Sequence, residues 1–422
     1  MPSRQSSPVW HPFTQHALVP QLPTVVRAEG AYLYTDQGRR IIDAISSWWV
    51  ITHGHCHPHI VAAIRAQADK LDQVIFANCS HEPAETVARR LVELTPEGLD
   101  YVFFSDSGST CVEVALKMAL GYWHHHGSLR HRVLVLEHSY HGDTIGAMSV
   151  GERGVFNRPY EPLLFSVGTL PFPSAGQEQA TLDALERQCR AEPDGVAALI
   201  VEPLVLGAGG MLMYPPWVLR ELRRICAAYE VLFIADEVMT GWGRTGTLFA
   251  CEQAQVTPDI ACYAKGLTGG SLPLAVTLCH EKIFEAHYSS DRRKTFFHSS
   301  SYTANPIACA AAVANLEIWD REPVRERIAA IAEHHRGRLE ALAEDPRFAH
   351  ARQCGTIAAI DVVVPDQGYL AGIGPRLSAY FAERGLLLRP LGNTLYLLPP
   401  YCVSERDLDQ LYEGMLEAIS RC

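Results

Sequence analysis

The chain has 422 residues, 48% of them hydrophobic, and a formal net charge of −11 at pH 7. The acidic balance argues against a nucleic-acid-binding surface, which needs clustered Lys and Arg, and no apolar run approaches the roughly 20 residues that span a bilayer. Residues 1–13 lack the apolar stretch of a secretory signal, and the twelve cysteines are scattered without a C-x-x-C pair. We therefore expect a protein of the reducing cytoplasm.

Short apolar runs alternate with amphipathic helical patterns through the middle of the chain. Buried strands are predicted at 101–104, 133–136, 197–201 and 231–235, and helices at 82–94 and 216–229. This alternation predicts an α/β fold with a mostly parallel sheet and helices on both faces. Ligands of such sheets bind beyond the carboxyl ends of the strands, so the residues after each run are the candidates for chemistry.

The pattern changes after about residue 315. A long helix is predicted at 323–342, followed by short strands near 357–364 and 395–398. We expect a large domain over 51–315 and a smaller α+β domain over 316–422, which the N-terminal residues 1–50 would complete.

Two segments that follow predicted strands offer groups for a phosphate and a planar ring. Small and hydroxyl residues at 105–110, among them Gly108 and Ser109, precede a helical run, and a helix N-terminus presents free N–H groups to a phosphate. An ordinary Ser/Thr N-cap is the alternative. Tyr140, directly after the strand at 133–136, has an aromatic face that can stack on a ring.

Asp236 and Lys265 end two further buried runs. Lys265 closes 260–264 and precedes a glycine-rich segment, whereas the four other lysines have the settings of solvated surface charges. Desolvation lowers an amine's pKa and makes it nucleophilic. A carboxylate at the next strand end, Asp236, can hold the ring nitrogen of pyridoxal 5′-phosphate (PLP) in its protonated form. The structural alternatives are an Asp that caps the next turn and a lysine that extends its amine to solvent. Because Asp236 and Lys265 end successive strands, a shared active site is favoured over both alternatives.

Two other patterns suggest a dinucleotide site and a metal site, but the surrounding sequence supports neither. Residues 241–246 match G-x-G-x-x-G, but the dinucleotide fingerprint requires these glycines directly between a strand and a helix, so we interpret them as a loop of the active site. The histidines at 53, 55, 57 and 59 and at 124–126 have no apparent set of partner ligands. We therefore expect no metal.

Taken together, these residues resemble the class III, fold-type I aminotransferases, over nearly the whole chain. Several runs are similar to the branch of this family that acts in biotin synthesis: Trp10–Gln15, Ser46–Trp49, His53–His55, Gly241–Gly246, Thr268–Gly270 and Arg389–Asn393. The resemblance implies a PLP-dependent transfer of an amino group to 7-keto-8-aminopelargonate in a homodimer with shared active sites.

The resemblance also implies a role for each site residue. Lys265 would form the Schiff base and move protons, with Asp236 on the ring nitrogen and Tyr140 stacked on the ring. Gly108 and Ser109 would hold the phosphate, which Ser301 of the neighbouring subunit would also reach. The residues implied for the substrate pocket are Trp48, Trp49, Asp143, Arg244, Tyr396 and Arg389, the last as the partner of the substrate carboxylate.

Two positions depart from the family pattern, and the activity has alternatives. Phe13 stands where a tyrosine is more usual, which removes a hydroxyl near the substrate, and Ser301 stands where a threonine is usual. The amino donor is therefore S-adenosylmethionine or, as a contender, lysine. The other activities considered are a class III transaminase of an ω-amino acid or diamine, a PLP-dependent aminomutase and, disfavoured by the complete catalytic set, a PLP-binding regulator.

Overall fold

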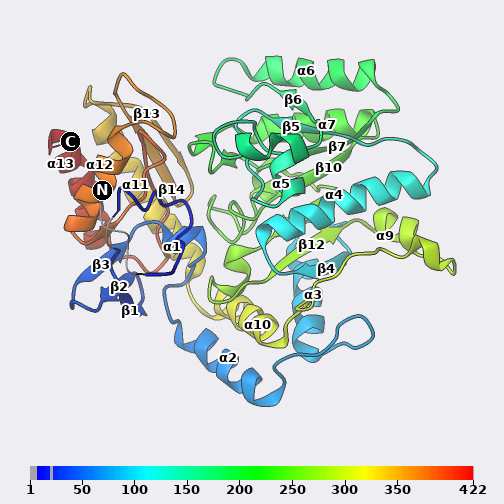
Figure 1. Cartoon of the computed structure of the whole chain (residues 1–422), viewed down its shortest axis with the longest axis horizontal. Helices are drawn as coiled ribbons and strands as arrows, with labels where there is room; N and C mark the ends of the chain where they lie inside the picture. Colours follow the sequence, from blue (N-terminus) through cyan, green and yellow to red (C-terminus); the bar gives the residue numbers. More distant parts are fainter. Residues whose placement is uncertain (1–6, 20–21, 422) are drawn as a thin grey trace.

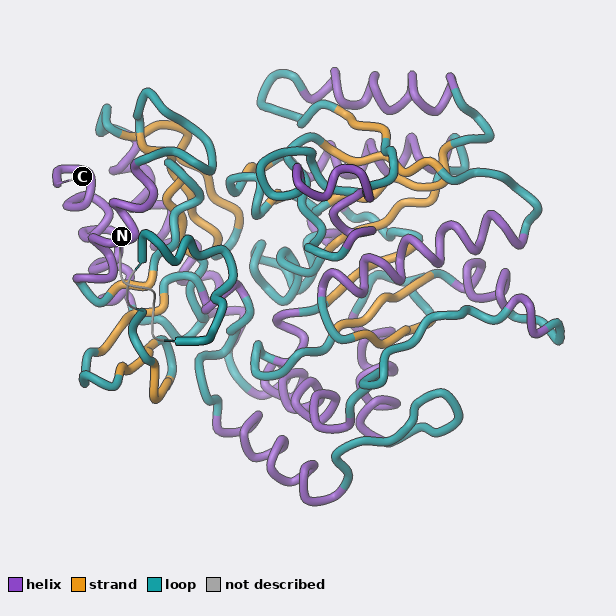
Figure 2. Tube along the Cα trace, viewed as in Figure 1, coloured by secondary structure: helices purple, strands orange, loops and turns teal. Residues whose placement is uncertain are grey.

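The computed structural model describes residues 7–19 and 22–421. Figure 1 shows a larger part, built around a seven-stranded sheet, beside a smaller part that contains the first strands and the last helix of the chain. Figure 2 shows that helices surround the sheet strands in both parts. Within the described ranges, no helix combines the length and the apolar character that crossing a bilayer requires.

The large sheet has the strand order β4-β12-β11-β10-β7-β5-β6. β12 runs antiparallel to both of its neighbours, and the other pairs are parallel. The strands are β4 (Tyr101–Ser105), β5 (Arg132–Leu136), β6 (Gly168–Leu170), β7 (Val196–Val201), β10 (Leu232–Asp236), β11 (Ile260–Tyr263) and β12 (Ala275–Cys279). The mostly parallel sheet predicted from the sequence is confirmed.

Side chains alternate between two helical layers, because successive residues of a strand point to opposite faces. In β10, Leu232 and Ile234 pack with α4, whereas Phe233 and Ala235 pack with α6 and α7. The helices around this sheet are α2 (Pro58–Lys70), α3 (Glu82–Leu94), α4 (Gly108–His125), α5 (Ile145–Ser149), α6 (Glu178–Ala191), α7 (Pro216–Ala228), α8 (Cys251–Ala254), α9 (Glu281–His287) and α10 (Pro306–Arg321).

The smaller part combines residues from both ends of the chain. Its two sheets have the orders β1-β2-β3-β15 and β13-β14-β16, so the first three strands share a sheet with a strand from the C-terminal region. Its strands are β1 (Val25–Glu29), β2 (Tyr32–Thr35), β3 (Arg40–Asp43), β13 (Phe348–Cys354), β14 (Ile357–Val362), β15 (Leu386–Leu387) and β16 (Thr394–Leu397). Its helices are α11 (Val324–Ala343), α12 (Ile373–Glu383) and α13 (Glu405–Arg421).

Two short elements connect these parts near the strand ends. α1 (Ser46–Trp49) follows β3, and the hairpin of β8 (Val205–Leu206) and β9 (Leu212–Met213) follows β7. The glycines at 241–246 lie in turns after β10, and no helix opens directly after them. This arrangement agrees with the interpretation of that segment as a loop.

Candidate active site

A cavity of about 420 Å³ lies where the carboxyl ends of five strands meet. The segments after β4, β5, β7, β10 and β11 each contribute to its lining, as is expected of ligand sites in open α/β sheets. Its polar lining residues include Ser107, Ser109, Tyr140, His141, Glu202, Asp236 and Lys265. The structure therefore brings together the groups that the sequence placed after separate strands.

Lys265 follows β11 and begins a short 3-10 turn, Lys265–Thr268. Its φ of +47° is in the left-handed region, which non-glycine residues adopt infrequently. Burial lowers the pKa of the Lys265 amine to about 8, although Asp236 and Glu202 act in the opposite direction. Its Nζ lies 4.8 Å from the centroid of the Trp49 ring. A substantial fraction of this amine is therefore neutral near pH 8 and able to act as a nucleophile.

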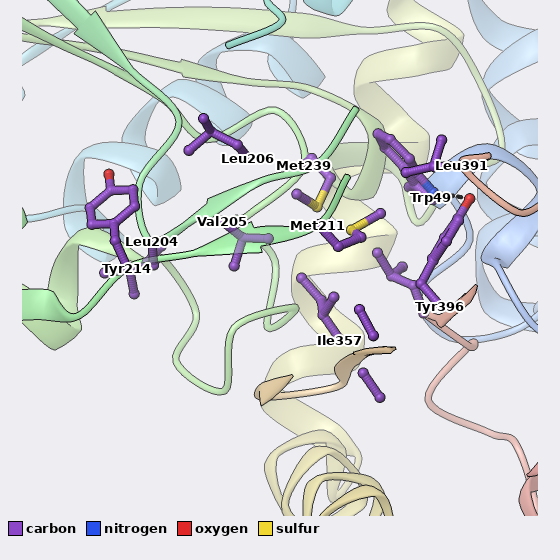
Figure 3. Close-up of a cluster of buried hydrophobic side chains, with 14 of the residues drawn as sticks. Trp49, Leu204, Val205, Leu206, Met211, Tyr214, Met239, Ile357, Leu391 and Tyr396 are labelled. Atoms are coloured by element: carbon purple, nitrogen blue, oxygen red, sulfur yellow. Dashed lines mark hydrogen bonds between the residues drawn. The ribbon is translucent and has the colours of Figure 1, made fainter. Parts of the chain in front are cut away.

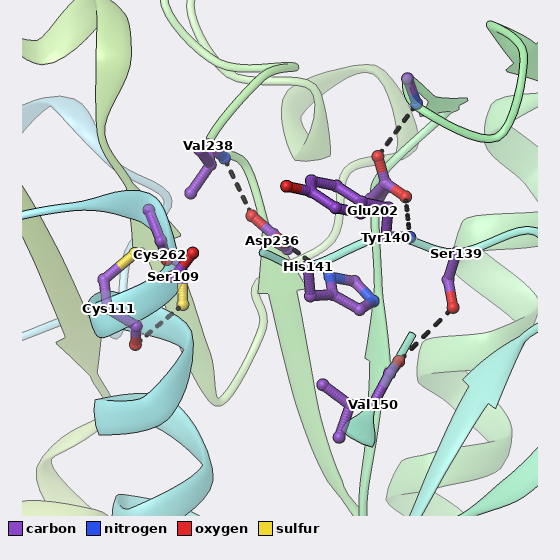
Figure 4. A network of polar contacts seen from close by, with 12 residues as sticks. Ser109, Cys111, Ser139, Tyr140, His141, Val150, Glu202, Asp236, Val238 and Cys262 are labelled. Carbon is purple, nitrogen blue, oxygen red and sulfur yellow. Dashed lines mark hydrogen bonds and ion pairs between the residues drawn. The ribbon is translucent and has the colours of Figure 1, made fainter. Parts of the chain in front are cut away.

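Asp236 is held by two donors at the end of β10 (Figure 4). Oδ1 accepts a hydrogen bond of 3.1 Å from the N–H of Val238, and Oδ2 lies 2.6 Å from Nδ1 of His141. The His141 ring is fully buried, and its Nε2 has no partner among the described residues. The sequence alone does not single out His141, because its importance depends on contact with a residue 95 positions away.

Glu202 and Tyr140 continue this polar network (Figure 4). The Glu202 carboxylate accepts hydrogen bonds of 3.0 Å from the N–H groups of Tyr140 and Gly207, and burial raises its pKa to about 7. Burial and the nearby Asp143 carboxylate raise the pKa of the Tyr140 phenol. Tyr140 is therefore a neutral aromatic ring over the whole physiological pH range, fixed through its backbone.

The N-terminus of α4 is closely packed and leaves little room for a side chain at its first residue. Ser107 and Thr110 cap it reciprocally, with the Thr110 N–H 3.2 Å from Ser107 Oγ and the Ser107 N–H 2.9 Å from Thr110 Oγ1. A Cβ at Gly108 would lie 2.7 Å from Cγ1 of Val238, so any larger residue would have to displace the Val238 side chain. The first N–H groups of a helix lack partners within the helix, and they attract anions. Ser109 Oγ meanwhile accepts from the Asp143 N–H at 3.1 Å.

Ser301 lies outside the cavity lining and is exposed on the surface of the chain. Its carbonyl accepts a hydrogen bond of 2.7 Å from Gln73 Nε2. The adjacent Ser300 hydroxyl donates to the carboxylate of Asp106 at 2.5 Å, which ties this loop to the segment after β4. The predicted contact of Ser301 with a neighbouring subunit's phosphate stays a prediction.

The paired tryptophans take different positions. Trp49 is buried and donates from Nε1 to the Tyr396 hydroxyl at 3.0 Å (Figure 3), whereas 38% of Trp48 is exposed. Ser46, Ser47 and Trp49 all have positive φ values, so the backbone of α1 turns sharply between the two rings. Trp49 thus connects the Lys265 amine to Tyr396 deeper in the molecule.

The two predicted substrate arginines have different surroundings. The Arg389 guanidinium lies 4.8 Å from the Trp48 ring centroid and 5.5 Å from that of Phe13. Arg244 is only 1% exposed and donates to the carbonyls of Pro399 at 2.9 Å and Ile51 at 2.7 Å. Arg244 therefore supports the backbone behind the pocket, and a direct contact with substrate stays a prediction.

The site's donors and acceptors fit PLP. The aldehyde would meet a lysine, the ring nitrogen a carboxylate, the ring face Tyr140, and the phosphate the N-terminus of α4. The unpartnered Nε2 of buried His141 lies in the same network. Each of these groups is of the type that PLP sites supply.

The histidines near the N-terminus are engaged in pairs. Each of three histidines lies within 3.0 Å of a different carboxylate, so the contacts are separate pairs: His55–Asp43, His57–Glu322 and His59–Glu317. Among the residues that the structure describes, no group of three or more His, Cys, Asp or Glu side chains is placed to hold a metal ion.

Comparison with known proteins identifies relatives over the full length of the chain. The family model of class-III aminotransferases matches residues 14–419. The adenosylmethionine-8-amino-7-oxononanoate aminotransferase of Synechococcus elongatus is 50% identical over 419 residues, covering 97% of this chain and 98% of that protein. The enzyme of the same name from Aquifex aeolicus is 37% identical, covering 97% of this chain and 95% of that protein.

Solved structures agree with these sequence relatives. The adenosylmethionine-8-amino-7-oxononanoate aminotransferase of Methanocaldococcus jannaschii superposes with a TM-score of 0.94 at 34% identity, over 98% of this chain and 97% of that one. A PLP-bound amine transaminase from an uncultivated Pseudomonas species also has a TM-score of 0.94, at 31% identity over 100% of both chains. This chain therefore belongs to the class-III aminotransferases, which are PLP-dependent enzymes.

Proposed function

We propose that this enzyme transfers an amino group to 7-keto-8-aminopelargonate (8-amino-7-oxononanoate) and forms 7,8-diaminononanoate in biotin biosynthesis. The observation that carries this proposal is the 50% identity, over nearly the whole of both chains, to a protein named adenosylmethionine-8-amino-7-oxononanoate aminotransferase. That name also makes S-adenosylmethionine the proposed donor. An assay of 7-keto-8-aminopelargonate with candidate donors tests the proposal directly, with the diamine detected by mass spectrometry.

The residues at the strand ends are assigned to PLP as follows. Lys265 binds the aldehyde, Asp236 pairs with the ring nitrogen, and Tyr140 stacks on the ring. Gly108 and Ser109 hold the phosphate at the N-terminus of α4. When bound, PLP supplies an electron-withdrawing ring that stabilises negative charge on the carbon that loses a proton.

The protein's own part in the chemistry is to move and direct a proton. The Lys265 amine, with its pKa near 8, is able both to accept a proton and to return it close to neutral pH. The face of the Trp49 ring covers one side of that amine, 4.8 Å from Nζ. The reaction proceeds in two halves, first with the donor and then with the keto acceptor, and the same lysine serves both.

The choice of amino donor depends on the substrate side of the pocket near Phe13. Phe13 contacts the Trp48 ring edge-on at 5.4 Å between centroids and supplies no hydroxyl. A single-turnover experiment that follows bleaching of the PLP absorbance with S-adenosylmethionine, lysine or a simple ω-amino acid separates these donors.

A general amine transaminase is the second candidate, favoured by the similarity to the PLP-bound amine transaminase. If only the simple amine or ω-amino acid bleaches the band, this candidate replaces the biotin-pathway proposal. An aminomutase would instead convert a single substrate without releasing a keto product.

Removal of the Arg389 guanidinium should weaken binding of the acceptor far more than it slows the half-reaction with the donor. The acceptor carries a carboxylate at the end of an apolar chain, and Arg389 offers a planar cation between the aromatic faces of Trp48 and Phe13. A charge-assisted hydrogen bond contributes about 1.5–3 kcal/mol, so Arg389→Ala should raise the acceptor's KM by about one to two orders of magnitude. The measurement is steady-state KM for the acceptor beside single-turnover rates with the donor.

A matched control for Arg389→Ala is Arg384→Ala, which removes a half-exposed arginine that pairs with Glu417 on the surface of the same part of the chain. We expect the acceptor's KM of this control to stay near the wild-type value. An equal loss in both half-reactions of Arg389→Ala would contradict the assignment of Arg389 to the acceptor carboxylate.

We further propose a homodimer whose active sites are shared between subunits. Ser301 lies in an exposed surface with large apolar side chains: Ile75 is 65% exposed, Phe297 71% and Tyr302 64%. These side chains lie in two loops, which are joined by the hydrogen bond from Gln73 to the Ser301 carbonyl. Apolar patches of this kind are typical of protein–protein contacts.

Heterodimers should show that the sites are shared. Lys265→Ala subunits lack the lysine, and Ser301→Asp subunits would repel the partner's phosphate, so each homodimer should be impaired. A mixed dimer contains one site with both Lys265 and Ser301 intact, and random mixing should restore about a quarter of the wild-type activity. A fully active monomer in sedimentation, or no recovery on mixing, would contradict this prediction.

We also propose the division of the chain that the sequence suggested. Residues 51–315 would form the large PLP-binding domain, and 1–50 together with 316–422 the small domain; residues 1–6, 20–21 and 422 lie outside the described ranges. The parallel pairing of β3 with β15 supports this division. The proposed location is the cytoplasm.

A further inference from the structure

Arg389 is surrounded by aromatic rings and one hydroxyl instead of carboxylates. Besides its contacts with Phe13 and Trp48, its Nη2 donates to the Tyr369 hydroxyl at 3.2 Å. Within the described part of the chain, Arg389 forms no ion pair. A half-buried cation without an anionic partner is prepared for an anion from outside the protein.

Tyr369 reaches Arg389 from a different segment and is held there by a second aromatic contact. It lies in the loop between β14 and α12, and its ring packs edge-on against Phe156, with 4.5 Å between centroids. Phe156 belongs to the loop after α5 and also contacts Phe13 at 6.1 Å. The Tyr369 ring is thus fixed between a loop of the larger part and the Arg389 guanidinium, so its hydroxyl needs no rearrangement before a ligand binds.

The Tyr369 hydroxyl has hydrogen-bonding capacity that the protein does not use. A phenol has one O–H donor and accepts through its oxygen lone pairs. The oxygen accepts from Arg389, and the O–H has no acceptor among the described residues. A carboxylate has two oxygens, so a guanidinium N–H and a neighbouring phenol O–H together match both of them.

We propose that Tyr369 is a specificity-determining residue that binds the acceptor's carboxylate together with Arg389, and that Phe156 holds it in position. This inference rests on the proposed function, in which Arg389 receives that carboxylate. With Tyr369 present, the pocket around Arg389 should bind a ligand with a terminal carboxylate more tightly than a ligand of the same length with a neutral end group. A Tyr369 that only packed against Phe156 would have no such effect on selection.

The test compares an anionic with a neutral ligand in Tyr369→Phe, which keeps the ring and removes only the hydroxyl. Nonanoate and nonanamide serve as ligands that bind without reacting, and calorimetry on the PLP-loaded wild-type and variant enzymes measures their dissociation constants. We expect Tyr369→Phe to weaken nonanoate by about tenfold, the size of one lost hydrogen bond to a charged group. Nonanamide should weaken by a clearly smaller factor, since its carbonyl accepts only a neutral hydrogen bond from this donor, and such a bond contributes less than one to a charged group.

The matched control is Tyr380→Phe, which loses a hydroxyl bonded to Glu417 at 2.8 Å on the surface of α12. This control should bind both ligands as the wild type does. Equal weakening of nonanoate and nonanamide in Tyr369→Phe would show a merely structural role, and unchanged nonanoate binding would show no role; either result overturns the proposal.

Failure of the proposed function would look different. In that case wild-type enzyme would not aminate 7-keto-8-aminopelargonate, whereas the binding comparison needs no turnover and still decides the role of Tyr369. Where turnover is seen, the KM of the keto acid should rise in Tyr369→Phe by a similar factor. The donor half-reaction should keep its rate, and a slower donor half-reaction would count against a role confined to the carboxylate.

Discussion

Replacing Lys265 by alanine should abolish turnover and leave PLP without a covalent attachment to the protein. Lys265 alone among the five lysines lines the cavity, and its amine has a pKa lowered to about 8 by burial. A positioned general acid–base group contributes about 10²–10⁴-fold, so the loss should reach about four orders of magnitude once the attachment is also lost. Borohydride reduction followed by peptide mass spectrometry should label Lys265 in the wild type and no peptide in the variant.

The control is Lys70→Ala, because Lys70 is an exposed lysine paired with Glu82 on the surface. It should retain both the label at Lys265 and full turnover. The lowered pKa adds a dependence on pH: an amine reacts in its neutral form, so PLP capture by the wild-type apoenzyme should accelerate as pH rises toward about 8 and level off above it. A label on another lysine, or turnover in Lys265→Ala, would contradict the assignment.

The sheet strands that could be predicted are those with continuous apolar runs. Every residue of β7 and β10 is buried, and both were predicted within one residue of their bounds. β12, β6 and the N-terminal β1 were not predicted. β12 is interrupted by Thr277 and follows a glycine-rich turn, β6 has only three residues, and β1 is mostly exposed, so their local patterns are weaker than those of β7 and β10.

Some site residues can likewise be predicted from the local sequence, whereas others gain their role only from long-range contacts. The positions of Lys265 and Asp236 could be predicted because a strand end is visible in the sequence, and both line the cavity at the carboxyl ends of neighbouring strands. His141 stood in a segment already identified, yet only its contact with Asp236 gives it importance. Tyr369 and Phe156 meet across 213 positions of sequence, a proximity that folding alone creates.

Arg244 shows that the surroundings of a charged residue also depend on long-range contacts that the sequence does not reveal. The family resemblance implied a place for it in the substrate pocket. Folding instead buries its guanidinium against the Tyr401 ring, 5.0 Å from the centroid, and gives it two backbone carbonyls. A buried arginine that holds backbone carbonyls and one that awaits a substrate have the same appearance in a sequence.

Asp236→Asn should leave PLP bound but strip the enzyme of most of its activity. The side chains have the same shape, so the hydrogen bond from the Val238 N–H can persist, and the phosphate cradle at α4 is untouched. A neutral amide no longer keeps the ring nitrogen protonated, which weakens the ring as an electron sink. Removal of one group that stabilises the charge developing in the transition state lowers kcat by about 10²–10³-fold. The measurements are PLP affinity, by titration of the apoenzyme, and kcat.

The two readouts separate a chemical role of Asp236 from a structural one. A PLP analogue methylated on the ring nitrogen carries a fixed positive charge, so it should restore part of the activity of Asp236→Asn but bring no gain to the wild type. Asp320→Asn, which loses only an exposed pair with Arg90, should match the wild type in both readouts. If Asp236→Asn were nearly as active as the wild type, another group would have to protonate the ring, and buried His141, 2.6 Å from Asp236, would be the first residue to replace.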